Sequence, residues 1–238
     1  MAIKDATLSL HSRAEFIMKF SQKEFDPFKE HYMDHLRELA KIIKDSGTPL
    51  EGNIFYDHWE SNLSDAHFSK QYLPKRRTLA MLGLVKRNIL EIGFNSGFSA
   101  LLLLTANPHL RIDSIDLCTH KYTKPCYEYL KRAFGDRICL YEGNSLEILT
   151  LLSNKRADYD AYIIDGGHAT ATAESDLFNI ISFSPKGSLI CFDDSDFPQL
   201  RVLLNMHMLT GNLISVADHI GYIGNVNQMF FLNNKSWS

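Results

Sequence analysis

Short apolar runs alternate with stretches of helical periodicity over most of the chain. Five runs rich in Ile and Leu are short enough to be buried strands. They are residues 88–93, 111–117, 138–142, 160–165 and 188–193. Helical stretches follow them at 97–106, 122–134, 145–154, 170–183 and 197–210. This alternation builds right-handed βαβ units, so we predict an α/β fold with a Rossmann-like, doubly wound, mostly parallel sheet.

The pattern changes at both ends of the chain. Residues 213–219 and 228–232 are strand-like and have no helix between them, which predicts an antiparallel C-terminal hairpin and a sheet of seven strands. Near the start, apolar residues from Phe25 to Ile43 recur every three or four positions, as on one face of an amphipathic helix. We therefore expect an N-terminal helical extension over residues 1–80 and one domain over residues 81–238.

Two segments of the extension precede the first strand. Residues 51–73 contain many aromatic side chains without a clear period. They are interpreted either as a lid over an acceptor pocket, which we favour, or as an apolar dimer interface. Lys75-Arg76-Arg77 then begins a short helix that continues to residue 84, and we interpret this cluster as an exposed face rather than a contact to an anionic substrate.

Composition limits the function. The formal net charge of -3 gives no strong attraction to phosphate backbones, so no nucleic-acid partner is expected. No apolar run approaches the roughly 20 residues that a membrane helix needs, and the first 16 residues lack the apolar stretch of a signal peptide. The four cysteines form no C-x-x-C pair, which fits reduced thiols. We expect a cytoplasmic protein without a membrane partner.

The first predicted strand runs into a glycine-containing turn, Glu91-Ile92-Gly93-Phe94-Asn95-Ser96-Gly97. Ligands of open α/β sheets bind beyond such strand ends. Gly93 permits a tight turn and a close approach of ligand to backbone, and Gly97 permits close packing of the next helix. Asn95 stands where dinucleotide-binding proteins have the glycine that lets the backbone reach a pyrophosphate. The turn therefore favours a cofactor without a pyrophosphate.

Polar residues follow the next two strands. Asp116 ends the second strand and is placed to accept hydrogen bonds from both ribose hydroxyls of a nucleoside. Asn144 and Ser145 follow the third strand, where they flank an adenine or serve as a helix N-cap. Glu91 can bind an ammonium group of the cofactor, directly or through a water molecule.

In this order, the glycine turn, Asp116 and the C-terminal hairpin resemble class I S-adenosylmethionine-dependent methyltransferases. The resemblance covers about residues 80–232. Asn95 departs from the glycine that is more common in that family. The resemblance implies S-adenosylmethionine as the cofactor. Its implied contacts are Glu91, Gly93, Asn95, Gly97, Asp116, Asn144, Ser145 and Asp165.

Carboxylates and a histidine follow the fourth and fifth strands. The fourth strand ends in Asp165-Gly166-Gly167-His168 and the fifth in Asp193-Asp194. Parallel strands end at one edge, so we expect these side chains to lie together, where the carboxylates repel unless a cation or hydrogen bonds compensate them. Carboxylate oxygens suit Mg²⁺ or Mn²⁺. We interpret Asp196 as the N-cap of the following helix and exclude it from the site.

This D-G-x-H sequence with its acidic pair is similar to a group of small-molecule O-methyltransferases that includes macrolide-sugar O-methyltransferases. The similarity implies that Asp165, Asp193 and Asp194 bind a divalent cation. It also implies that His168 is the catalytic base, with Asp165 beside it. The acceptor would be a small molecule with a hydroxyl group.

The sequence disfavours three other functions. Asn95 and the D-G-G-H sequence argue against an NAD-dependent oxidoreductase. A catalytically degenerate fold that binds a cofactor or protein partner is disfavoured because Asp116, Asp165, His168 and the Asp193-Asp194 pair all occur in one chain. Methylation of a nucleic-acid base is disfavoured because residues 165–168 lack the N/D-P-P-Y/F/W tetrapeptide. The acceptor and the oligomeric state stay open, a homo-oligomer included.

Overall fold

The computed structural model describes residues 25–57, 63–153, 158–216 and 227–235. Within them, seven strands form one sheet in the order β3-β2-β1-β4-β5-β7-β6. The strands are β1 (Asn88–Ile92), β2 (Arg111–Asp116), β3 (Ile138–Glu142), β4 (Ala161–Ile164), β5 (Leu189–Phe192), β6 (Leu213–Ser215) and β7 (Met229–Asn233). Strands β1 to β5 pair in parallel, and β7 pairs antiparallel with β5 and β6. The predicted Rossmann-like, mostly parallel sheet is confirmed. Residues 217–219, predicted as the end of a strand, lie outside the described residues.

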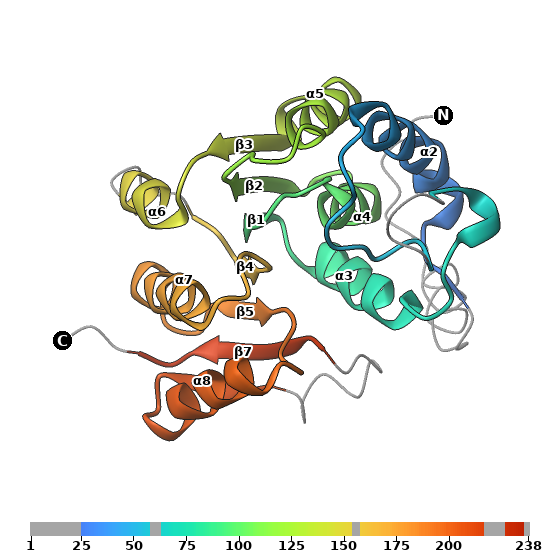
Figure 1. The fold of residues 1–238 in the computed structure, drawn as a ribbon. Helices are drawn as coiled ribbons and strands as arrows, with labels where there is room; N and C mark the ends of the chain where they lie inside the picture. The colour runs from blue at the N-terminus through green and yellow to red at the C-terminus, as the bar shows by residue number, and fades with distance from the viewer. Residues whose placement is uncertain (1–24, 58–62, 154–157, 217–226, 236–238) are drawn as a thin grey trace.

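Helices cover both faces of this sheet (Figure 1). They are α2 (Lys29–Ser46), α3 (Leu73–Val85), α4 (Phe98–Ala106), α5 (Thr123–Phe134), α6 (Ser145–Ser153), α7 (Thr170–Phe183) and α8 (Pro198–Leu209), with 3-10 turns η1 (Asp65–His67) and η2 (Gly135–Arg137). The groups α3–α5 and α6–α8 lie on opposite faces, and α2 packs outside α4 and α5. Because both faces are covered, the central strands are nearly continuous apolar runs. No helix of the described residues is long and apolar enough to cross a membrane.

The N-terminal segments share one core with the sheet. Tyr32 and Leu36 of α2 are fully buried in the same apolar cluster as the leucines of α4. In the aromatic segment, Phe55 packs edge-on against Phe98 of α4, with ring centroids 5.1 Å apart. The described part of residues 51–73 is therefore packed against the domain.

The basic cluster at the start of α3 is not an exposed face, and that interpretation is wrong for Lys75 and Arg76. Arg76 is 1% exposed. Its guanidinium donates hydrogen bonds to the carboxylate of Asp26 (2.9 Å) and to the carbonyls of Ile54 (2.8 Å) and Ser69 (2.9 Å). These partners lie in different parts of the N-terminal half, so one buried side chain holds three segments together.

Replacing Arg76 with methionine tests this assignment. Arg76→Met leaves the Asp26 carboxylate buried without its cation, so we expect unfolding free energy to fall by about 3–5 kcal/mol. Urea unfolding followed by circular dichroism measures the change. The control Arg132→Met alters an exposed arginine of α5 and is expected to change stability by no more than about 0.5 kcal/mol. Equal stability of the two variants would contradict the assignment.

Candidate active site

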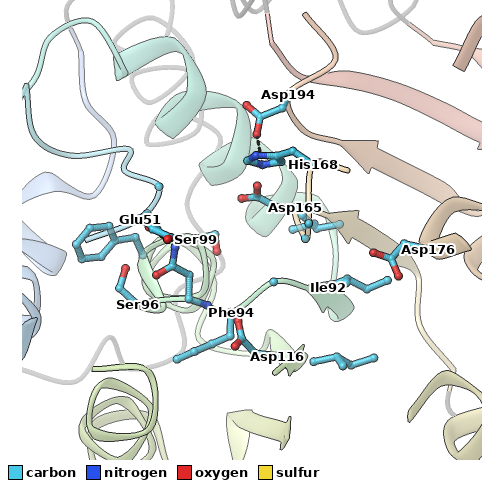
Figure 2. A pocket seen from close by; sticks show the side chains of 18 of the residues that line it. Glu51, Ile92, Phe94, Ser96, Ser99, Asp116, Asp165, His168, Asp176 and Asp194 are labelled. Carbon is cyan, nitrogen blue, oxygen red and sulfur yellow. Dashed lines mark hydrogen bonds and ion pairs between the residues drawn. The ribbon is translucent and has the colours of Figure 1, made fainter. Parts of the chain in front are cut away.

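A cavity of about 690 Å³ lies at the carboxyl edge of the parallel strands (Figure 2). The loops after β1 to β5 line it, together with residues of the N-terminal half. The volume falls in the range of about 300–1,000 Å³ that is common for small-molecule sites. Strand order reverses between β1 and β4, and ligands of open α/β sheets bind at that point.

The turn after β1 forms the floor of the cavity. Gly93 has a φ of +97°, and a Cβ at this position would lie 1.9 Å from the carbonyl oxygen of Asp165, so only glycine fits. Asn95 also lines the cavity with a positive φ of 52°, a conformation that asparagine tolerates. Gly97, predicted as a cofactor contact, lies outside the cavity wall and under the ring of Phe94 and the side chain of Leu130.

Asp116 lines the cavity at the end of β2, as predicted. Its two carboxylate oxygens accept hydrogen bonds from the backbone N–H groups of Asn95 (2.8 Å) and Cys118 (2.7 Å). A carboxylate has about four lone-pair sites, so Asp116 retains acceptor capacity for ribose hydroxyls. The same side chain thus holds the turn and faces the ligand space.

Glu91 does not reach the cavity. Its side chain is fully buried and accepts hydrogen bonds from the hydroxyls of Ser99 and, at 2.6 Å, Ser114. Burial raises the pKa of Glu91 to about 7, although the two serines act to lower it. Ser99 lines the cavity instead, so contact of Glu91 with a ligand would pass through Ser99. Sequence reasoning missed Ser99, although it lies in the first turn of the helix after the glycine turn.

Asn144 and Ser145 both line the cavity after β3. Asn144 accepts a hydrogen bond from the backbone N–H of Leu146 (2.9 Å), so it also caps α6. Ser145 donates a hydrogen bond to Asp176 of α7. Asp176 is buried in the cavity wall, and burial raises its pKa although Ser145 opposes this. Asp176 was also missed, because nothing local in α7 marks it.

The N-terminal half closes one side of the cavity through Glu51. The Glu51 carbonyl accepts a hydrogen bond from the Asn95 side chain, and the Glu51 N–H donates to the Tyr122 hydroxyl at 3.1 Å. The Glu51 carboxylate lies 3.2 Å from Nε2 of His120. Residues 51–54 are thus part of the cavity wall, and the lid interpretation of residues 51–73 stays a prediction.

His168 and Asp194 form an ion pair at the upper end of the cavity in Figure 2. Nε2 of His168 lies 2.7 Å from Oδ2 of Asp194, and the other Asp194 oxygen accepts a hydrogen bond from Asn227 (3.2 Å). The Asp194 hydrogen bond raises the pKa of His168, and partial burial opposes this. Burial acts to raise the pKa of Asp194, but its bond to His168 brings the pKa below its usual value. The imidazole is thus oriented by a carboxylate.

Lys75 of α3 reaches the same cluster. Its ammonium donates to Oδ2 of Asp193, and the two side chains are only 11% and 1% exposed. Burial acts to lower the pKa of Lys75, but the carboxylates of Asp193, Asp165 and Asp194 raise it above the usual value. Burial and the neighbouring Asp193 raise the pKa of the Asp165 carboxyl well above its usual value. A lysine that sequence reasoning placed in solvent therefore compensates the predicted carboxylate cluster.

The predicted ligand set does not form a common coordination site. Among the described residues, the ligand atoms of Asp165, His168 and Asp194 lie within 4.8 Å of one another, and Asp193 is not a member of that group. Asp193 faces Lys75, and Asp194 is already paired with His168. A divalent cation held by the group of three would lie beside the Lys75 ammonium, whose charge has the same sign. With Asp193 held by Lys75, the arrangement does not fit the predicted three-carboxylate site for Mg²⁺ or Mn²⁺.

Asp196 does not cap α8 as predicted. The N-cap residue of α8 is Phe197, and no side-chain hydrogen bond caps the helix. Pro198 at the first helical position lacks the N–H that a cap would satisfy first. Asp196 stays outside the cavity wall, as expected.

Comparison with known proteins agrees with the fold. Residues 90–195 match the family model described as a methyltransferase domain. No curated protein sequence matches the chain. The match begins within β1 and ends after Asp194, so it covers the glycine turn and both polar strand ends.

Solved structures with the same fold include two cofactor complexes. The O-methyltransferase TomG from Streptomyces achromogenes, in complex with S-adenosylmethionine, is 18% identical, with a TM-score of 0.59 over 85% of this chain and 90% of that chain. An O-methyltransferase from Bacillus cereus, in complex with S-adenosylhomocysteine, is 17% identical, with a TM-score of 0.57 over 87% and 95%. CalS11, a TDP-rhamnose 3'-O-methyltransferase, is 18% identical, with a TM-score of 0.56 over 84% and 93%.

The family match and the shared fold confirm the predicted resemblance. Residues 90–195 match a methyltransferase-domain model, and the sheet has the fold of the solved O-methyltransferases.

Gly93→Ala tests the close approach at the cavity floor. The new Cβ would overlap the Asp165 carbonyl, so the turn must move, and we expect affinity for S-adenosylhomocysteine to fall at least about tenfold. Isothermal titration calorimetry measures the affinity. The control Gly187→Ala has a similar φ of +88° but nothing within 4 Å of the new Cβ, so it carries the same backbone strain without the overlap. Wild-type affinity in Gly93→Ala would contradict this account.

The His168–Asp194 pair predicts a titration shift. By NMR, the pKa of His168 should lie above the usual value of about 6.5 and should fall in Asp194→Asn. Asp194 binds the protonated imidazole, so its stabilisation is present below the usual pKa and is lost as pH rises through the shifted pKa. His207 is an internal control, because burial lowers its pKa independently of Asp194. An unchanged His168 titration in Asp194→Asn would rule out the pair.

Proposed function

We propose that this chain transfers the methyl group of S-adenosylmethionine to a hydroxyl group of a small molecule. The observation that carries the proposal is the His168–Asp194 pair, which opens into the same cavity as the glycine turn and Asp116. Methyl transfer to a hydroxyl needs a base and a cofactor-binding site in the same cavity.

The cofactor is assigned along the strand ends. Asp116 accepts hydrogen bonds from the ribose hydroxyls, and Asn144 and Ser145 flank the adenine with Asp176 behind them. Gly93 and Asn95 approach the methionine part, with Ser99 at the wall in front of Glu91. In this assignment, the sulfonium lies toward the end of the cavity that contains Asp165 and His168.

The proposed reaction moves one proton and one methyl group. The neutral imidazole of His168 accepts the hydroxyl proton at Nδ1, while Asp194 stabilises the resulting imidazolium at Nε2. The acceptor oxygen forms a bond to the methyl carbon as the bond from carbon to sulfur breaks, and S-adenosylhomocysteine results. Holding both reactants in one cavity removes much of the entropic cost of their encounter.

The size and lining of the cavity support a small acceptor. At about 690 Å³, it has room for a cofactor and a compact second molecule. Tyr72 and Phe197 line the acceptor end with aromatic surface. Oxygen as the acceptor atom is also supported by the names of neighbours, including TomG and the sugar-modifying CalS11.

A methyl-transfer assay tests the proposal. S-adenosylhomocysteine binding is first measured by calorimetry, and labelled methyl transfer is then screened on sugars, phenols and other hydroxylated small molecules. With an acceptor found, His168→Ala is expected to lower kcat about 10²–10⁴-fold, because it removes the general base, while cofactor affinity stays unchanged.

The control is His109→Ala, which alters an exposed histidine after α4 and should retain full activity. Full turnover by His168→Ala would exclude the proposed base. A folded wild-type protein that fails to bind S-adenosylhomocysteine would overturn the methyltransferase proposal. It would favour a degenerate fold or, if NAD bound instead, an oxidoreductase.

A further inference from the structure

Lys75 stands out as a buried cation inside the candidate site. It comes from α3, in the N-terminal half, and reaches the carboxyl end of β5 on the sheet. A lysine is almost never buried to this degree without a partner. Here Asp193 is the direct partner, and Lys75 also lines the cavity.

The electrostatics of the site centre on this ammonium. Asp165, Asp193 and Asp194 all act on Lys75, so it lies among the carboxylates that the sequence predicted as ligands of a divalent cation. His168, which is paired with Asp194, supplies a second cation when it is protonated. The compensation that three clustered carboxylates require is therefore present within the chain.

We propose that the Lys75 ammonium is the resident cation of this site and takes the electrostatic place of a divalent metal, so that methyl transfer needs no metal ion. The inference rests on the proposed function and deepens it. Lys75 fixes Asp193 and the β5 end, and it lines the same cavity as His168. A fixed positive charge near the acceptor oxygen stabilises the charge that develops in the transition state.

Metal affinity gives a readout that a purely structural lysine would not change. Lys75→Met keeps most of the side-chain length but removes the charge, which leaves the carboxylates uncompensated. Mn²⁺ binding, followed by electron paramagnetic resonance, is expected to be weak and nonspecific in the wild type and at least about tenfold tighter in Lys75→Met. Lys75→Arg retains the charge and should behave as the wild type. Adding Asp194→Asn to Lys75→Met should abolish the gain.

Lys70→Met is the matched control, because it removes an exposed lysine just before α3 and should leave Mn²⁺ affinity unchanged. S-adenosylhomocysteine binding, measured in every variant, reports whether the fold and the proposed function hold independently of the metal result. Once an acceptor is known, wild-type turnover should be equal in EDTA and in Mg²⁺.

If Lys75→Met does not fold, the wild-type protein alone can test the inference. Its melting temperature should be the same in MgCl₂ and in NaCl of equal ionic strength, because a metal that binds the native state would raise it. Tight Mn²⁺ binding to the wild type that Asp194→Asn removes would overturn the inference. So would a folded Lys75→Met without a gain in Mn²⁺ affinity, or turnover that EDTA abolishes.

Discussion

The buried ion pair between Lys75 and Asp193 joins the N-terminal helices to the sheet at the point where the cavity lies. Removing two charges from water is costly, and such a pair is tolerated only when its partners are well placed. The next residue, Arg76, extends the constraint in the other direction, toward Asp26, Ile54 and the rest of the N-terminal half. Helix α3 therefore holds the cavity wall on one side and the strand ends on the other.

The sheet could be predicted because its signal is local. Helices cover both faces, so the parallel strands are short apolar runs, and all five predicted runs contain a strand of the sheet. The polar residues at the strand ends were also visible, since a parallel sheet brings Asp116, Asp165 and Asp194 to one edge without knowledge of tertiary contacts. Gly93 could also be predicted, because both the turn and the close approach of the Asp165 carbonyl require glycine.

The missed residues depend on contacts between distant parts of the chain. Lys75 and Asp193 are 118 positions apart, and a basic triplet at a helix start has the same local pattern whether it is solvated or buried. Ser99 and Asp176 lie on helices, where their roles arise only from what packs against them. Glu91 is the opposite case, a predicted ligand contact that does not reach the cavity. Its position in the motif is visible in the sequence, but the two serines that bind it are not.

One side of the cavity is formed mainly by backbone and the other mainly by side chains. The strand-end side depends on backbone geometry, with Gly93 against the Asp165 carbonyl leaving no space for a substituent. The N-terminal side presents side chains such as Leu79 of α3 and Tyr72 at its N-cap, and the backbone of this helix is held by its own hydrogen bonds. Under the proposed function, engineering of acceptor range should therefore begin at α3, where side chains can be exchanged while the glycine turn and Asp116 are left intact. Lys75 should be kept, because it pairs with Asp193.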